Sequence, residues 1–124
     1  MLKVALIGPA GQLGTEIVAS KPGEVELVPL GRNALDITRP GEAESVLITL
    51  RPDVIINTAA YVRVDDAEDE AEEAFRVNAL GVKYLAMAAK KTGAVLVHIS
   101  TDYVFDGGKK PSPYNEDDAP NPLN

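Results

Sequence analysis

The amino-acid sequence predicts an α/β fold with a doubly wound parallel sheet. Apolar segments of strand length alternate along most of the chain with segments that have helical spacing. The first apolar segment, residues 2–7, runs directly into the glycine-rich segment Gly8–Gly14, which opens a helix. Alternation of this kind produces parallel strands joined by right-handed crossovers. Both observations therefore favour a parallel sheet with helices on its faces.

Four segments are predicted to form strands: residues 2–7, 25–30, 53–57 and 94–99. The first, third and fourth are nearly continuous apolar runs, which are typical of strands buried on both faces of a parallel sheet. The short segment 35–37 is a candidate for one further strand. His98 lies within the fourth run, and we predict a packed core histidine rather than a ligand.

Three helices are predicted between the strands, over residues 11–20, 41–50 and 67–91. Pro40 suits a helix start, and Pro52 prevents continuation of the second helix. Gly93 follows the third helix, where glycine favours the C-cap. From Thr101 onward the chain is polar and rich in glycine and proline, which predicts a long loop. Such a loop at the carboxyl end of a strand lies over the ligand crevice of this type of sheet.

The composition is that of a globular protein of 124 residues, with 45% hydrophobic and 25% charged residues. There is no cysteine, no apparent signal peptide and no apolar run near the roughly 20 residues that span a bilayer. We therefore expect a cytoplasmic protein without membrane attachment. The net charge of −7 argues against nonspecific nucleic-acid binding. It originates in residues 65–73, which hold seven acids and are interpreted as a solvated helix face.

The segment Gly8–Gly14 has the chemistry of a dinucleotide-binding turn. Gly8 allows a tight turn, Gly11 lets the backbone approach a pyrophosphate, and Gly14 permits close packing of helix on strand. The helix N-terminus offers unpaired N–H groups and the positive end of a dipole to phosphates. The spacing is G-x-x-G-x-x-G, and the alternative is a turn with incidental glycines. A Rossmann-type sheet is the expected fold.

Four blocks stand in the order found in a known family: Gly8–Gly14, Leu35–Thr38, Pro52–Tyr61 and His98–Gly107. With the closing Pro120–Asn124, they make the chain similar to the dTDP-4-dehydrorhamnose reductases, which are extended short-chain dehydrogenase/reductases. The block Ser-Thr-Asp-Tyr-Val-Phe is the most specific of these motifs. By this resemblance, residues 1–124 are the N-terminal portion of an NAD(P)-binding domain, and the sheet is incomplete at its C-terminal end.

The resemblance implies a set of residues that bind NADPH or NADH. Asp36 and Ile37 resemble the adenine contact, and the alternative for Asp36 is an N-cap or turn aspartate. Arg32 follows the second strand, where a cation can meet a ribose 2′-phosphate, or it is a solvated surface residue. The full set is Gly8, Gly11, Gln12, Leu13, Gly14, Arg32, Asp36, Ile37, Ala59, Ala60 and Tyr61.

Thr101 is the predicted catalytic residue, because its hydroxyl can donate a hydrogen bond to a substrate carbonyl as negative charge develops on the oxygen. By resemblance, Val64 and Tyr103 contact the substrate, and the alternative for Tyr103 is a core aromatic. Tyr103 also replaces the glutamate of related sugar-nucleotide dehydratases, which favours simple reduction over dehydration or epimerisation. Asn78 resembles an asparagine that braces the active-site strand in the wider superfamily, whereas a solvent-facing asparagine would look the same.

Two departures from the family pattern are visible. Val62 follows Tyr61 where the family usually has threonine. The catalytic Tyr-x-x-x-Lys pair, in which the tyrosine protonates the carbonyl oxygen and the lysine lowers the tyrosine pKa, is absent from these 124 residues. We therefore expect the natural protein to extend beyond Asn124.

The sequence thus predicts the cofactor-binding part of an NAD(P)H-dependent reductase. Its substrate would be the 4-keto group of a dTDP-4-dehydro-6-deoxy-hexose, in dTDP-rhamnose biosynthesis. The alternative is a cofactor-binding module without catalysis, such as the NADP-binding regulatory subunit of methionine adenosyltransferase, which has the same motifs. Family members often form homodimers with the help of magnesium, but no metal site is recognisable in the sequence.

Overall fold

The computed structural model describes residues 1–108 and 111–124 and arranges its strands in one parallel sheet. The strands are β1 (Leu2–Ile7), β2 (Val25–Leu30), β3 (Val54–Asn57) and β4 (Val95–His98), in the order β2-β1-β3-β4. Ile7 stands in register with Leu30 on one side and Asn57 on the other. The predicted α/β class is confirmed, and each predicted strand agrees with the observed one to within one residue at either end.

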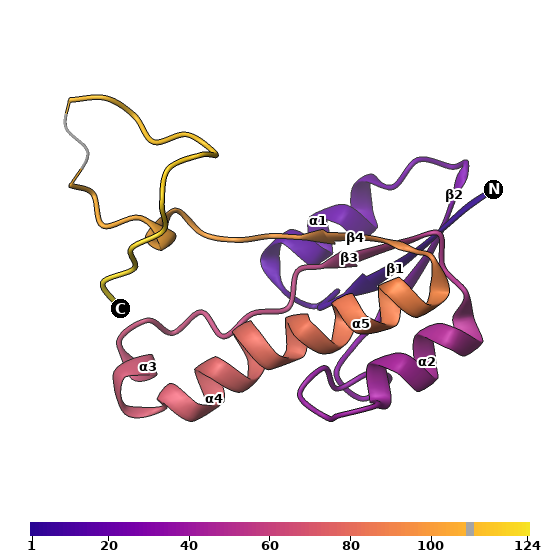
Figure 1. Ribbon diagram of the computed structural model, residues 1–124. Helices are drawn as coiled ribbons and strands as arrows, with labels where there is room; N and C mark the ends of the chain where they lie inside the picture. The colour runs from indigo at the N-terminus through magenta and orange to yellow at the C-terminus, as the bar shows by residue number, and fades with distance from the viewer. Residues whose placement is uncertain (109–110) are drawn as a thin grey trace.

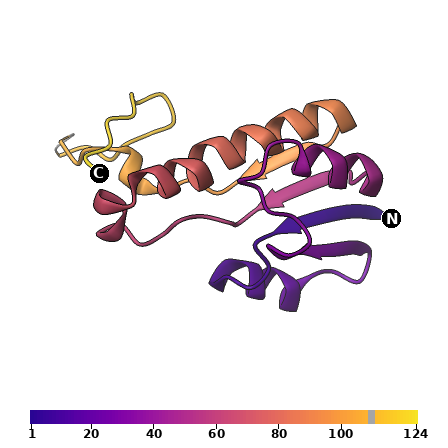
Figure 2. The ribbon, with the colours of Figure 1, turned by 90° about the horizontal axis from the view of Figure 1, so that it is seen from below.

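Helices cover both faces of the sheet (Figures 1 and 2). α1 (Gln12–Ser20) lies on one face, and α2 (Glu42–Leu50) and α5 (Val82–Thr92) lie side by side on the other. The chain passes from β1 through α1 to β2, and then through α2 to β3 on the opposite side of β1. The connections therefore diverge at the carboxyl ends of β1 and β3, where open α/β sheets bind ligands.

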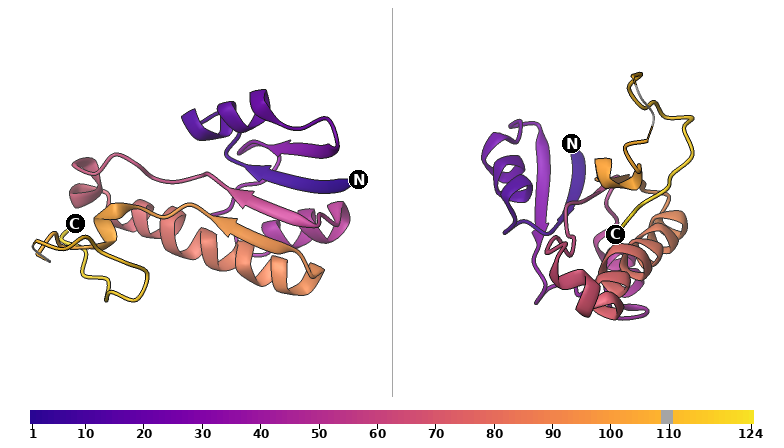
Figure 3. Two further views of the ribbon diagram at one scale, coloured as in Figure 1. Left: turned by 90° about the horizontal axis from the view of Figure 1, so that it is seen from above. Right: turned by 90° about the vertical axis from the view of Figure 1, so that its left-hand side faces the viewer.

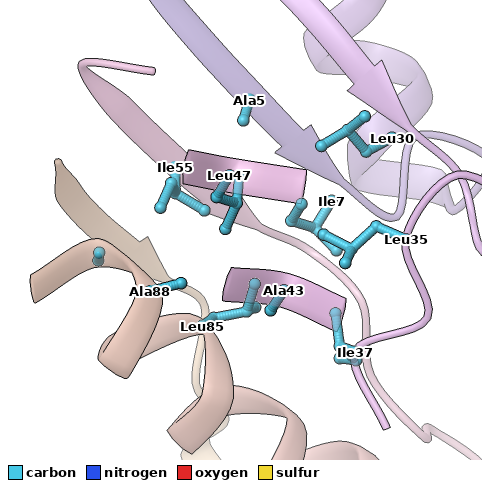
Figure 4. Packing of buried hydrophobic residues seen from close by; sticks show 11 residues of the cluster. Ala5, Ile7, Leu30, Leu35, Ile37, Ala43, Leu47, Ile55, Leu85 and Ala88 are labelled. Carbon is cyan, nitrogen blue, oxygen red and sulfur yellow. The ribbon is translucent and has the colours of Figure 1, made fainter. Parts of the chain in front are cut away.

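The hydrophobic core lies between the sheet and the pair α2 and α5 (Figure 4). Its buried side chains are Ala5, Ile7, Leu30, Leu35, Ile37, Ala43, Leu47, Ile55, Leu85, Ala88 and Ala89. Burying each of the larger ones contributes about 1.5–3 kcal/mol relative to exposure. Leu35 and Ile37 extend this core toward the carboxyl ends of the strands, so the segment beside the predicted cofactor site is anchored by packing.

The prediction of a further strand at residues 35–37 is wrong, because residues 35 and 36 have no regular secondary structure and Ile37 begins a turn. Leu35 and Ile37 are buried, as alternate residues of a strand would be. The backbone N–H of Asp36, however, donates to Glu42 Oε1 at 2.8 Å, and its carboxylate accepts from the Thr38 N–H at 3.0 Å. These side-chain bonds replace strand pairing, as short polar side chains do in turns.

The predicted helix over residues 67–91 is divided. It comprises α3 (Asp66–Asp69), α4 (Ala71–Phe75), a π-helical segment (Arg76–Gly81) and α5. The break at Glu70 has backbone angles φ −109° and ψ 37°. Acids four residues apart, such as Asp66 and Glu70, repel each other along a continuous helix, which favours an interruption within this segment.

β4 is an exposed edge strand, so the prediction that it is buried on both faces is wrong. Val95 and Val97 point to the same face of the sheet and are 61% and 41% exposed. Leu96 points the other way and packs against the core. His98 is exposed as well, which corrects the prediction of a packed core histidine. The apolar composition of β4 therefore reflects the burial of only one of its two faces.

Two segments project beyond the carboxyl ends of the strands, on the side opposite the N-terminus (Figures 1 and 3). One joins β3 to α4, and the other is the loop that follows β4. Both therefore lie at the end of the sheet where a ligand is expected. Within residues 1–108 and 111–124, no helix has the length and apolar character needed to cross a membrane.

Candidate functional site

A cavity of about 560 Å³ opens at the carboxyl ends of β1 and β3. Of the predicted cofactor-binding residues, it is lined by Gly8, Gly11, Arg32, Asp36, Ile37, Ala59, Ala60 and Tyr61. Gln12, Leu13 and Gly14 lie next to it in the first turn of α1 and do not line it. Segments that are far apart in the sequence therefore meet around one cavity of the size that small-molecule sites have.

The three glycines of the turn have different steric surroundings. Gly8 has φ +77°, and a Cβ there would lie 2.8 Å from the backbone nitrogen of Ala59. A Cβ on Gly14 would lie 2.2 Å from the carbonyl oxygen of Gly8. A Cβ on Gly11 would meet the same oxygen at 3.6 Å, which is ordinary contact. The fold itself thus requires glycine at 8 and 14, whereas glycine at 11 leaves a gap that faces the cavity.

Asp36 lines the cavity together with residues of the glycine turn. Its Oδ1 accepts hydrogen bonds from the hydroxyl of Thr38 at 2.7 Å and from the Thr38 N–H. Its Oδ2 faces Arg32 at 3.5 Å and Arg39 at 3.7 Å. The hydrogen bond from the Thr38 hydroxyl is the main cause that lowers the pKa of Asp36, and Arg32 lowers it further. Asp36 is thus a turn aspartate that also lines the cavity.

Arg32 extends over the cavity with its side chain 74% exposed. Besides Asp36, its guanidinium faces Glu73 Oε1 of α4 at 3.8 Å. Both ion pairs are long and exposed to solvent, so they hold the guanidinium weakly. An incoming anion could therefore replace them without leaving a buried charge unpaired.

A polar framework holds the segment that follows β3. The hydroxyl of Thr58 lies 2.8 Å from the carbonyl oxygen of Ile7 and 3.0 Å from that of Gly8. Asn57, which is fully buried, accepts from the Ala59 N–H at 3.1 Å and pairs through its side-chain nitrogen with His98 Nδ1 at 3.2 Å. The carboxyl ends of three neighbouring strands are thereby fixed relative to one another.

Asn78 completes this framework from the π-helical segment. Its amide accepts from the N–H of Tyr61 at 2.8 Å and donates to the carbonyl oxygen of the same residue at 2.9 Å. Asn78 is exposed, yet its amide holds the backbone beyond the end of β3, and its bracing of the active-site strand stays a prediction. π-helical turns occur frequently at functional sites, and this one lies directly against the cavity wall.

A charged cluster at the rim of the cavity was not predictable from the sequence patterns. The Tyr61 hydroxyl donates to Glu70 Oε2, which also accepts from Arg63 at 3.1 Å. Arg63 pairs with Asp66 at 3.1 Å, and its guanidinium carbon lies 5.3 Å from the centre of the Tyr61 ring. The bond to Glu70 raises the pKa of Tyr61.

Most of residues 65–73 are exposed, as the interpretation of a solvated face predicts. Glu70 and Glu73 of this segment also line the cavity, where they pair with Arg63 and Arg32. The sequence signalled only Arg63 next to the seven acids, because Arg32 is distant from them along the chain. Among the described residues, no three or more acidic, histidine or cysteine side chains are grouped so that they could hold a metal ion.

Thr101 lies outside this cavity, at the start of a short 3₁₀ turn over Asp102–Val104. Its Oγ1 accepts from the Tyr103 N–H at 3.2 Å and donates to Asp102 Oδ1 at 3.4 Å. The second bond is long, so the hydroxyl proton is readily available to another acceptor.

The predicted substrate residues do not come together. Tyr103 lines a second cavity of about 590 Å³ within the loop after β4, together with Asp102, Phe105 and Tyr114. Val64 is 40% exposed in the segment before α3 and lines neither cavity.

Comparison with known proteins identifies close relatives. A curated dTDP-4-dehydrorhamnose reductase from Burkholderia thailandensis is 42% identical over 123 residues, which cover 99% of this chain and 41% of that protein. The corresponding enzyme from Mycobacterium tuberculosis is 41% identical over 124 residues, with 97% and 40% covered. The chain thus spans about two fifths of the length of the curated relatives it matches.

Solved structures give the same result. A dTDP-4-dehydrorhamnose reductase from Bacillus anthracis, determined in complex with NADP, is 40% identical with a TM-score of 0.95, covering 100% of this chain and 45% of that one. A second reductase from Clostridium acetobutylicum is 43% identical with a TM-score of 0.93, covering 98% of this chain and 43% of that one. These neighbours confirm the Rossmann-type fold.

The sequence model of one protein family matches residues 2–124, which is nearly the whole chain. Its description agrees with the resemblance carried by the glycine turn and the Ser-Thr-Asp-Tyr-Val-Phe block. The chain belongs to the family described as the RmlD substrate binding domain.

Proposed function

We propose that the chain is the nucleotide-binding part of an NAD(P)H-dependent reductase that acts on the 4-keto group of dTDP-4-dehydrorhamnose. The observation that carries the proposal is the cavity at the carboxyl ends of β1 and β3, beside the glycine turn. The relatives named dTDP-4-dehydrorhamnose reductase, one of them solved with NADP, support the substrate and the cofactor.

The residues around the cavity fit a dinucleotide. The gap beside Gly11 and the N–H groups at the start of α1 suit a pyrophosphate, because a side chain is missing where the backbone must be approached. Arg32 offers a cation to a ribose 2′-phosphate, which favours NADPH over NADH. Ile37 and Asp36 offer an apolar wall and a carboxylate to adenine, and Ala59, Ala60 and Tyr61 form the opposite wall.

The bound cofactor supplies a hydride to the substrate carbonyl carbon. Thr101 then has the role of stabilising the negative charge on the carbonyl oxygen, since its hydroxyl exchanges the long bond to Asp102 for one to that oxygen. Tyr103 and Val64 are assigned to the sugar nucleotide. We assign the proton-donating Tyr-x-x-x-Lys pair to the part of the relatives' length that this chain does not span. A magnesium ion and a homodimer stay predictions of the resemblance.

The test is an assay of the full-length protein with NADPH and dTDP-4-dehydrorhamnose. Loss of NADPH absorbance and formation of dTDP-rhamnose, identified by mass spectrometry, are the expected result. Calorimetric titration with NADPH alone serves as the control for cofactor binding. Binding of NADPH without turnover would overturn the proposed reaction and favour a binding subunit. Absence of NADPH binding would overturn the assignment of the cavity.

A further inference from the structure

Asp106, in the loop after β4, accepts three hydrogen bonds. Its Oδ1 accepts from the backbone N–H of Gly108 and from the hydroxyl of Tyr114, both at 2.7 Å. Its Oδ2 accepts from the side-chain amide of Asn121 at 2.8 Å. A single exposed carboxylate thus connects three points of a loop that spans more than a dozen residues.

Two further contacts hold together the same loop that Asp106 connects. The rings of Phe105 and Tyr114 stack with their centres 4.3 Å apart and an angle of 9° between their planes. The backbone N–H of Asn121 donates to the carbonyl oxygen of Val104 at 2.7 Å. Residues 114 and 121 are therefore fastened to residues 104–106, directly after the 3₁₀ turn of Thr101 and Tyr103.

The same residues enclose the second cavity. Tyr103, Phe105, Asp106 and Tyr114 all line it, so the position of the Tyr103 ring depends on how this loop is closed. This cavity is separate from the one beside the glycine turn, because the two share no lining residue. A change at Asp106 can therefore affect one cavity without reaching the other.

We propose that Asp106 is a positioning residue for the sugar-nucleotide side of the reaction, which it serves by holding Tyr114 and Asn121 so that Thr101 and Tyr103 are presented to the substrate. This inference rests on the proposed function. It assigns Asp106 no contact with the reacting atoms. Its effect is to preorganise a loop whose misplacement would weaken substrate orientation.

The chemistry of the cluster favours a carboxylate at this position. Three donors converge on two oxygens, and an ionised carboxylate is an acceptor at both. An asparagine would keep one acceptor oxygen, but its amide nitrogen could bond Asn121 only after that amide turned to present its oxygen, and the charge-assisted bonds would be replaced by weaker neutral ones. The three hydrogen bonds also lower the pKa of Asp106 to about 2, which keeps it ionised near neutral pH.

The test compares Asp106→Asn with the exchange variant Asp106→Asn/Asn121→Asp in the full-length protein. In the exchange variant the amide at position 106 can donate to the carboxylate at position 121, which restores the connection with its polarity reversed. We expect Asp106→Asn to lower kcat/KM for the sugar nucleotide about tenfold, with a lowered kcat as well as a raised KM, because loss of orientation raises the barrier to reaction. The exchange variant should recover most of this loss, and the KM for NADPH should change less than about twofold in both.

Unchanged kcat/KM for the sugar nucleotide in Asp106→Asn would overturn the inference. An equal loss for both substrates together with a lowered Tm would overturn it too, since that pattern indicates a general structural role. Amide hydrogen exchange of Gly108 and Asn121 in the same variants gives an independent readout. If the wild-type protein shows no turnover, the proposed function fails. Unchanged exchange in Asp106→Asn would instead show that the carboxylate does not hold the loop.

Discussion

The side-chain amide of Asn78 pairs with the backbone of Tyr61 through both of its polar groups, as a neighbouring strand would. The donor and acceptor distances are 2.9 and 2.8 Å. Tyr61 lies beyond the end of β3, where the strand no longer has a partner for its backbone. A side chain from the π-helical segment thus continues the pairing and holds Tyr61, which lines the cavity beside the glycine turn. Under the proposed function, Asn78 is expected to support cofactor binding although it does not line the cavity.

Replacing Asn78 with alanine should weaken NADPH binding and lower the free energy of unfolding by about 1 kcal/mol, since two partly exposed hydrogen bonds are lost. Calorimetric titration and urea unfolding of the full-length protein measure the two effects. Lys83→Ala, at an exposed position in α5, is the matched control and should leave both unchanged. An Asn78→Ala variant with wild-type affinity for NADPH would show that the Tyr61 backbone is held by other contacts.

The glycine turn allows folding and binding to be separated. Gly14→Ala would place a Cβ 2.2 Å from the Gly8 carbonyl oxygen, so it should lower the free energy of unfolding by about 3 kcal/mol or more. Gly11→Ala has room for the added methyl and should preserve stability. The same methyl faces the cavity, so it should obstruct the pyrophosphate and reduce NADPH affinity at least about tenfold.

Thermal unfolding and NADPH titration of both variants check this pair of outcomes. Gly23→Ala, where a Cβ meets nothing within 4 Å, is the control for inserting alanine at a glycine. Wild-type NADPH affinity in a folded Gly11→Ala variant would remove Gly11 from the pyrophosphate site.

The strands and the glycine turn were predictable because their signals are local. An apolar run reports burial, and β1 and β2 begin and end where the sequence indicates. The spacing of Gly8, Gly11 and Gly14 likewise predicts a turn into a helix. The class of fold and one wall of the cavity follow from such patterns alone.

Features that depend on distant side chains were not predictable in the same way. Leu35 and Ile37 alternate as in a strand, but the bonds of Asp36 to Thr38 and Glu42 make a turn. Whether both faces of β4 are buried depends on the segments that pack against it, which an apolar run does not specify. The rim cluster forms because the chain turns back between Tyr61 and Glu70 and brings their side chains together. Asp106 likewise accepts a hydrogen bond from Asn121, which is fifteen residues away.

The preference between the two nicotinamide cofactors should depend on Arg32. Arg32→Gln is expected to raise the KM for NADPH about tenfold, because a charge-assisted contact to the 2′-phosphate is removed, and to leave the KM for NADH nearly unchanged. Arg39→Gln is the matched control. Arg39 faces the same oxygen of Asp36 with a similarly exposed side chain, but it does not line the cavity.

Initial-rate measurements with both cofactors give the ratio of the KM for NADPH to the KM for NADH directly. Equal effects of the two substitutions on NADPH would mean that Arg32 acts through Asp36 and not on the phosphate. An unchanged ratio in Arg32→Gln would assign the 2′-phosphate to a different group.

The closure of the loop after β4 should be resistant to acid. The pKa of Asp106 falls from 3.8 to about 2 in the folded protein, because Asn121, Tyr114 and Gly108 all donate to its ionised form. For a carboxylate whose pKa is depressed by folding, the stabilising contribution is fully present above the unfolded value and is lost as pH falls through the folded value. The loop contacts should thus persist at pH 4 and disappear progressively between about 4 and 2.

The amide resonance of Gly108 reports this titration, since its N–H donates directly to the Asp106 carboxylate at 2.7 Å. Its chemical shift should follow a midpoint near 2, and the step should vanish in Asp106→Asn. A midpoint at the ordinary aspartate value would mean that the three donors do not bind the carboxylate when the protein is in solution. Protonation of Asp106 would then not destabilise the loop. The Gly108 midpoint therefore tests, without any substrate, whether the loop that carries Tyr103 is held by the charge of Asp106.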